Sequence, residues 1–146
     1  MTTNIEWLTK YLLSLYEQNA YVSLLDMKIV KLAEGYAELS MPIETKHTNL
    51  YNMAHGGALA SLADTAMGIA CATTGKKVVT LEMNMNFIKS AAPQVGLKGI
   101  GKIIHNGEST IIAEGQILDG QNKVIVSARG TFFVTGVFEE MVSHQD

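Results

Sequence analysis

The feature that most constrains this 146-residue chain is a long apolar segment that contains one acidic side chain. His55-Gly56-Gly57 leads into residues 58–74, where Asp64 is the only Asp, Glu, Lys or Arg. Small and apolar side chains fall on every face of this predicted helix, so we expect other elements to enclose it on several sides. An enclosed carboxylate is costly unless it is paired, solvated by a cleft or partly protonated. Asp64 is therefore either a structural exception or the working group of a site.

The composition sets limits on the class of protein. Hydrophobic residues make up 47% of the chain, enough for one domain with a core. The net charge is −3 and no basic cluster is present, which argues against a nucleic-acid partner. A lone cysteine, Cys71, excludes an internal disulfide and is interpreted as a small buried hydrophobic residue. The N-terminus lacks a signal-peptide pattern and residues 54–72 are too weakly hydrophobic to span a bilayer, so we expect a cytoplasmic protein with no membrane partner.

The remaining pattern predicts strands around the apolar helix. We expect an N-terminal helix within residues 1–20 and a hairpin made by residues 24–33 and 36–42, turning at Glu34-Gly35. Four strands follow as a meander, at residues 78–88, 95–105, 108–118 and 123–134, and then a loose tail at 136–146. Strands beside one enclosed helix predict an α+β fold, with the sheet of a single domain (residues 1–146) wrapped around that helix.

The first of these four strands alternates in polarity. One face is expected to carry Val79, Leu81, Met83, Met85 and Phe87, and the other Thr80, Glu82, Asn84 and Asn86. On the polar face, the Thr80 hydroxyl is positioned to hold a water molecule or to hydrogen-bond Asp64. The alternative is that Thr80 and Glu82 belong to an ordinary sheet face or to a subunit contact.

The glycine pair before the helix allows two interpretations. The first turn of a helix leaves N–H groups without partners at the positive end of its dipole, so the Gly57 N–H can stabilise negative charge developing on a carbonyl oxygen. Alternatively, Gly56 and Gly57 only permit a tight entry into the helix. Asn49 and Asn52 lie in the approach to the helix. The alternative to a role in the site is that they only stabilise a turn there.

The spacing of Gly57 and Asp64 predicts a dimer. Seven residues of helix separate their backbones by about 10 Å, too far for one reacting carbonyl to touch both groups easily. Two such helices, antiparallel across a two-fold axis, would bring each Gly57 near the Asp64 of the other chain.

Several other chemistries lack their patterns. His47, His55, His105 and His144 show no metal-binding spacing, and no Gly-x-Ser-x-Gly elbow is present for a serine nucleophile. We therefore expect no metal and no other cofactor.

These residues resemble a known family, the hotdog-fold acyl-CoA thioesterases, and most closely its phenylacetate-degradation branch. The resemblance is carried by Asn49, by His55-Gly56-Gly57, by Asp64 within Ala-Leu-Ala-Ser-Leu-Ala-Asp-Thr-Ala, and by Thr80 within Val-Val-Thr-Leu-Glu-Met-Asn. The segments Phe87-Ile-Lys-Ser-Ala and Ala128-Arg-Gly-Thr-Phe are also similar to that branch, so the similarity covers about residues 22–135. Asn52 and Ser90 depart from the family, where Gly and Pro are common.

The resemblance implies a curved antiparallel sheet around one long helix, a homodimer that commonly pairs into a homotetramer, and a site at the dimer interface. It implies that Asp64 is the general base or nucleophile, that the Gly57 N–H polarises the thioester carbonyl, and that Thr80 aligns the attacking water. Asn49 and His55 would position the site. The expected substrate contacts are Gly56, Glu82, Lys89 and Arg129, the last two meeting the CoA phosphates.

The leading hypothesis is therefore an acyl-CoA thioesterase acting on an acyl-CoA substrate. Direct attack by water and attack by Asp64 through an anhydride both fit, as do aromatic and medium aliphatic acyl groups. The alternative is a hotdog protein that binds an acyl thioester without cleaving it, as a sensor or carrier. A hydratase is not supported, because the Asp and His pair usual in hydratases is not seen in this sequence. A purely structural domain would not explain the presence of Asp64 in the apolar helix.

Overall fold

The computed structural model describes residues 5–139 of the chain, and the expectations about the N-terminal leader and the last residues of the tail lie outside that range. The elements are, in order, α1 (Ile5–Glu17), α2 (Ala20–Leu24), β1 (Lys28–Ala33), β2 (Tyr36–Pro42), the 3-10 turn η1 (Thr45–His47), α3 (Gly56–Ala72), β3 (Lys76–Phe87), β4 (Gly96–Asn106), β5 (Thr110–Leu118) and β6 (Val124–Val137). The predicted α+β class is confirmed.

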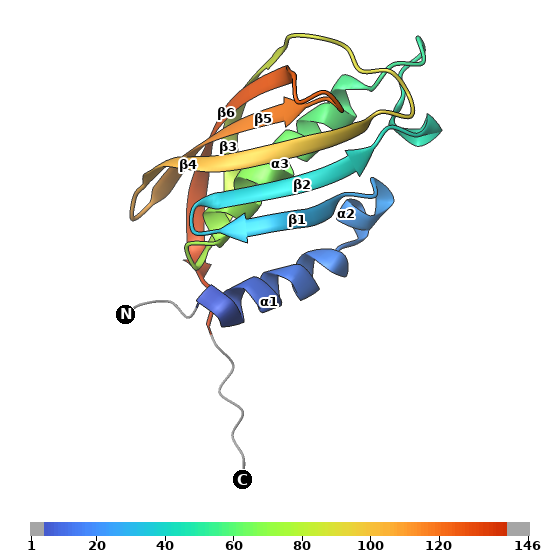
Figure 1. Cartoon of the computed structure of the whole chain (residues 1–146). Helices are drawn as coiled ribbons and strands as arrows, with labels where there is room; N and C mark the ends of the chain where they lie inside the picture. Colours follow the sequence, from blue (N-terminus) through green and yellow to red (C-terminus); the bar gives the residue numbers. More distant parts are fainter. Residues whose placement is uncertain (1–4, 140–146) are drawn as a thin grey trace.

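The six strands form one antiparallel sheet with the order β1-β2-β4-β5-β6-β3. The predicted hairpin is β1–β2, and β4, β5 and β6 form the predicted meander. The meander does not include β3, which pairs with β6 at the far edge of the sheet. The reason is the connection from β3 to β4, residues 88–95: it is long and contains Pro93, so it carries the chain across the sheet instead of closing a hairpin (Figure 1).

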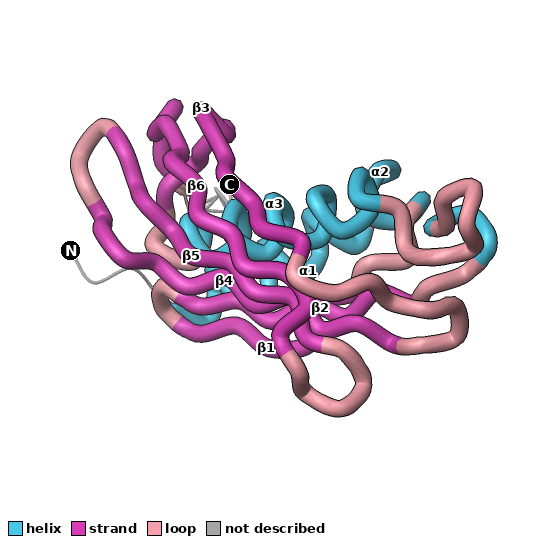
Figure 2. The backbone as a smooth tube through the Cα atoms, turned by 90° about the horizontal axis from the view of Figure 1, so that it is seen from above, coloured by secondary structure: helices cyan, strands magenta, loops and turns pink. Residues whose placement is uncertain are grey.

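The helix α3 lies against the concave face of this sheet, as Figures 1 and 2 show. Its inward side chains are fully buried and contact strands across the sheet; the largest of them are Leu62, Met67 and Ile69. Cys71 is buried among them, as predicted. The apolar composition of this segment is thus explained by enclosure on several sides.

One glycine allows the helix to approach the sheet closely. A Cβ atom added at Gly101 of β4 would overlap the backbone carbonyl oxygen of Ala66 on α3. Only glycine permits this contact, so Gly101 sets the helix-to-sheet distance at the middle of α3.

The N-terminal region contains a second helix that the sequence pattern did not predict. Asn19 caps α2, accepting a 3.1 Å hydrogen bond from the N–H of Val22 with its side-chain oxygen. The strand expected from Leu24 therefore starts only at Lys28. Leu8 and Leu12 of α1 are buried in a small cluster with Ala72, at the end of α3.

The alternation predicted for β3 is wrong because it does not continue across Leu81, where the strand has a bulge. Thr80 pairs with Phe132 and Glu82 with Thr131, so Leu81 is an extra residue without a partner on β6. The bulge moves the side chains after it to the opposite faces. Thr80 therefore lies on the α3 side with Met83 and Met85, whereas Glu82 points to the outer face.

The last strand is longer than predicted. Lys76 of β3 pairs with Val137 of β6, so residues 136 and 137 belong to the sheet and not to the tail. No helix within residues 5–139 is both long enough and apolar enough to cross a membrane.

Candidate active site

Asp64 and Thr80 meet between α3 and the edge strand β3. The Thr80 hydroxyl donates a 2.7 Å hydrogen bond to Asp64 Oδ1. A hydrogen bond to Asp64 was one of the two roles predicted for Thr80. Both residues line a cavity of about 360 Å³. No basic side chain within residues 5–139 forms an ion pair with Asp64. Asp64 therefore faces a cleft and has no ion-pair partner in the described part of its own chain.

Asp64 lies on the one open stripe of α3. The helix residues that are not buried follow each other at helical spacing, and they are Gly56, Gly57, Ala60, Ser61, Asp64, Thr65 and Gly68. The predicted placement of Gly57 and Asp64 on one face is confirmed. The stripe begins at the N-terminus of the helix, so a ligand lying along it would meet free backbone N–H groups at one end and the carboxylate two turns later.

His55 caps the start of α3. Its Nδ1 atom accepts a 2.8 Å hydrogen bond from the N–H of Gly57, and its carbonyl oxygen accepts bonds from the N–H groups of Ala58 and Leu59. Among the described residues, no hydrogen bond uses the N–H of Gly56. The helix dipole and this N–H together make the helix start an acceptor-binding position.

The loop before α3 is held by side-chain hydrogen bonds. Asn49 Oδ1 accepts from the N–H groups of Tyr51 and Met53 at 2.9 and 3.1 Å, which is the turn chemistry considered as its alternative role. His47 is buried; its Nδ1 accepts from the Glu44 N–H, so its Nε2 donates to the Leu25 carbonyl. The His55 N–H in turn donates to the His47 carbonyl at 2.7 Å. The hydrogen bonds of Asn49 and His47 thereby fix the positions of His55 and of the start of α3.

Three predicted substrate contacts lie away from Asp64 of the same chain. Glu82 accepts a 2.7 Å hydrogen bond from Thr131 on the outer face of the sheet. Arg129 lies on that face too, opposite Asn84 and Glu114, and lines a separate hollow of about 270 Å³. Lys89 is exposed after the end of β3. Sequence alternation placed Thr80 and Glu82 on the same face. The bulge that puts them on opposite faces cannot be detected from the pattern of polar and apolar residues.

The cavity around Asp64 also contains residues that the sequence did not identify. Aromatic side chains from distant segments line part of it, together with Gly68; these aromatics are Tyr16, Tyr21, Phe132 and Phe138. Each has the spacing of an ordinary core residue, so no local pattern separates them from the core. Their convergence is a consequence of packing.

Burial shapes the titration of two groups near Asp64. It raises the pKa of the Tyr16 phenol above the ordinary value, and electrostatic interaction with Cys71 and Asp64 adds to this effect. Burial also raises the pKa of the Cys71 thiol to about 12. Cys71 is therefore a neutral core residue at physiological pH and not a nucleophile. Within residues 5–139, no group of three or more His, Cys, Asp and Glu side chains could hold a metal ion.

A curved antiparallel sheet around one long helix, with a carboxylate on the open stripe of that helix, defines a hotdog domain. The sequence model of the thioesterase superfamily matches residues 51–126, just over half of the chain. A protein of Archaeoglobus fulgidus is 31% identical over 119 residues, which are 82% of this chain and 77% of that protein. The chain belongs to the thioesterase superfamily, the thioester hydrolases with this fold.

The relatives include members of the predicted branch. The acyl-coenzyme A thioesterase PaaI of Escherichia coli K12 is 29% identical over 80% of this chain and 84% of its own. The solved structure of the E. coli PaaI protein has a TM-score of 0.87 and 25% identity, covering 94% of this chain and all of that one. The resemblance to the phenylacetate-degradation branch is thus confirmed.

A hypothetical thioesterase from Streptococcus pneumoniae TIGR4, solved with coenzyme A, has a TM-score of 0.75 and 27% identity, covering 77% of this chain and 91% of that one. Alanine variants of a thioesterase from that strain have been solved at an aspartate and at a threonine sixteen positions further along. Asp64 and Thr80 have the same separation of 16.

Proposed function

We propose that this thioesterase acts on acyl-CoA, releasing a free carboxylic acid and CoA. The observation that carries the proposal is the Asp64 carboxylate, which lines a cavity without an ion-pair partner among the described residues and accepts a hydrogen bond from Thr80. A thioester is already activated, so its hydrolysis needs a base and a polarised carbonyl more than a metal. The CoA-containing S. pneumoniae structure and the name of the E. coli relative support the CoA part.

Asp64 has the geometry of a general base or a nucleophile. Thr80 occupies Oδ1, which leaves Oδ2 to accept a proton from water or to attack the carbonyl carbon. In the first route water adds directly; in the second a mixed anhydride forms and is then hydrolysed. In both, the Thr80 hydroxyl fixes the orientation of the carboxylate.

The donor that polarises the carbonyl is the N–H of Gly56 in this proposal. The sequence assigned the role to Gly57, but the Gly57 N–H donates to His55 Nδ1. The Gly56 N–H has no such partner among the described residues, and it lies one residue closer to the positive end of the helix dipole. Gly57 and His55 would then keep the first turn in place, as the cap geometry suggests.

A second chain completes the proposed site. Gly56 and Asp64 are eight residues apart on one helix, so their backbones are about 12 Å apart and one thioester cannot contact both. Within residues 5–139 one edge of β3 pairs with no strand, and Val79 and Leu81 of this strand are 53% and 57% exposed. An open strand edge with exposed apolar side chains favours pairing with a second copy. We therefore propose a homodimer, and the homotetramer remains a prediction of the resemblance.

Replacing Asp64 with Asn tests the assignment. The variant keeps shape and hydrogen bonding to Thr80 but loses the base, so we expect kcat/KM for aryl-CoA hydrolysis to fall by about 10²–10⁴-fold with an unchanged urea midpoint. Glu108→Gln, an exposed carboxylate in the turn between β4 and β5, is the matched control and should keep near wild-type activity. Comparable turnover by wild type and Asp64→Asn would exclude this role for Asp64. Tight acyl-CoA binding by wild type without thiol release would instead support a sensor or carrier.

A further inference from the structure

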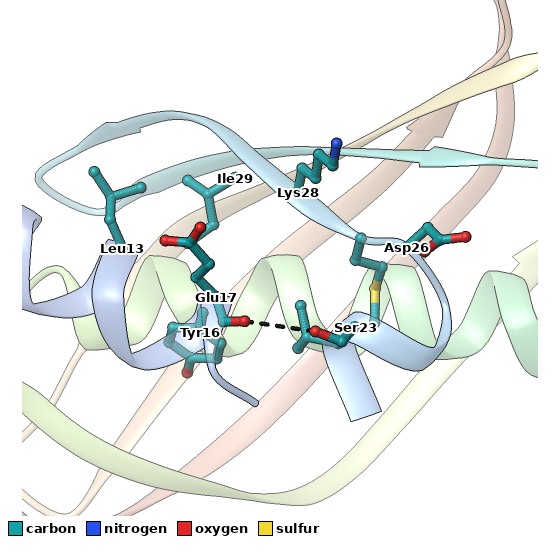
Figure 3. A pocket seen from close by; sticks show the side chains of 9 residues that line it. Leu13, Tyr16, Glu17, Ser23, Asp26, Lys28 and Ile29 are labelled. Carbon is teal, nitrogen blue, oxygen red and sulfur yellow. Dashed lines mark hydrogen bonds between the residues drawn. The ribbon is translucent and has the colours of Figure 1, made fainter. Parts of the chain in front are cut away.

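Two cavities of this molecule share one wall. The smaller, of about 360 Å³, contains Asp64 and Thr80. The larger, of about 640 Å³, lies between α1, α2 and β1 and contains none of the predicted site residues (Figure 3). Of the residues that the structure describes, only Tyr16 and Val22 line both cavities. These two side chains therefore stand between the proposed catalytic cleft and a second, larger space.

Tyr16 forms this wall with its ring. Figure 3 shows its hydroxyl pointing away from Leu13 and Ile29, which lie on the side of the larger cavity. Tyr16 lines the smaller cavity together with Asp64 and Thr80. No hydrogen bond among the described residues uses the Tyr16 hydroxyl. The ring is thus held by packing at the end of α1 and not by a polar tether.

The part of the larger cavity next to that wall is apolar. Leu13, Met27 and Ile29 line this part, while polar side chains line the rest of the cavity, namely Glu17, Ser23, Asp26 and Lys28 (Figure 3). Ligand pockets in proteins span about 300–1,000 Å³. The cleft around Asp64 alone lies at the low end of that range, and joining it to the second cavity would bring it near the high end.

We propose that Tyr16, supported by Val22, is the end wall of the acyl pocket and restricts this enzyme to short or compact acyl groups. The inference rests on the proposed function, since it takes the Asp64 cleft as the acyl site. Both residues lie in α1 and α2, before the residues 51–126 that match the superfamily. Acyl-chain selection would thus be set by an N-terminal segment outside the matched region.

The test compares wild type with Tyr16→Ala and Tyr16→Phe. We would measure kcat/KM for butyryl-, octanoyl- and dodecanoyl-CoA, and affinity for the matching S-alkyl-CoA thioethers, which cannot be hydrolysed. Tyr16→Ala should shift both optima to longer chains, by roughly fourfold for each further methylene buried. Tyr16→Phe keeps the ring and should keep the wild-type profile. Leu13→Ala is the matched control, because it enlarges only the larger cavity and should leave the profile unchanged.

Each outcome decides the inference. An unchanged chain-length profile in Tyr16→Ala, or an equal shift in Tyr16→Phe, would overturn it. If Tyr16→Ala fails to fold, Val22→Ala opens the same wall with fewer atoms removed, and it must shift the optimum in the same direction. Thioether binding that depends on chain length, without thiol release by wild type, would overturn the proposed function and leave the wall supported. Thiol release by wild type, with chain-length profiles that do not change between variants, would support the proposed function and overturn the wall.

Discussion

At the scale of single residues, the contact between Asp64 and Thr80 depends on one extra residue in β3. Without the bulge at Leu81, either Thr80 or the Met83–Met85 pair would have to face away from α3. The bulge places a hydroxyl beside the carboxylate and still leaves the two methionines packed against the core. A bulge beside a functional group is a common way to direct one side chain without disturbing the strand.

Thr80→Ala should therefore lower kcat more than it raises KM. It removes one hydrogen bond to a charged group, worth about 1.5–3 kcal/mol, which corresponds to roughly 10–100-fold in rate. Thr80→Ser retains the hydroxyl and should recover most of the activity in the same steady-state assay. If the Ala variant has wild-type kcat, or if Ser does no better than Ala, Thr80 does not orient Asp64.

At the scale of elements, the fit of α3 to the sheet depends on Gly101. Gly101→Ala should destabilise the fold by about 1–3 kcal/mol or more, because the new methyl group meets the backbone of α3 and not a side chain that can rotate. Gly96→Ala on the same strand is the matched control, since a Cβ there meets nothing within 4 Å. Urea unfolding curves measure both variants, and equal midpoints would contradict the claimed close contact.

The elements also show what the sequence could and could not predict. The apolar run of α3, the Glu34-Gly35 turn and most strand positions followed from periodicity and turn residues. The place of β3 at the sheet edge could not be predicted, since the alternation of a strand is the same whether it pairs with β4 or with β6. The short helix α2 was missed because its five residues are fewer than periodicity can detect.

The candidate site, too, was predicted from the sequence only in part. Asp64 and the glycines were found because one charge in an apolar helix is a local anomaly. The His55 cap on Gly57, the outward position of Glu82 and Arg129, and the wall formed by Tyr16 all depend on three-dimensional packing. Such contacts join residues far apart in the chain, and no single segment records them.

At the scale of the whole molecule, the proposed site requires two chains. The open stripe of α3 carries the proposed base and the proposed backbone donor, which are too far apart for one substrate, and the open edge of β3 lies beside that stripe through the Thr80 contact. A two-fold axis there would create two equivalent sites, each taking Asp64 from one chain and the Gly56 N–H from the other. Neither chain alone would then hold a complete site.

The N–H of Gly56 can be removed while the start of the helix keeps its backbone conformation. It is the first residue of α3, where proline is well tolerated, and His55 before it has the extended conformation that precedes proline (φ −66°, ψ 135°). Gly56→Pro should therefore fold and lose the donor. Gly56→Ala keeps the N–H, and its Cβ would lie 3.7 Å from the Phe87 ring, an ordinary contact.

The most direct test of the shared site is to co-express Asp64→Asn with Gly56→Pro and measure thiol release. Each variant alone should be nearly inactive. With random pairing, half of the dimers are mixed and each mixed dimer has one intact site, so activity should return to about one quarter of wild type. Recovery near that level would support a site built from both chains, whereas a mixture no more active than its two inactive parents would contradict it.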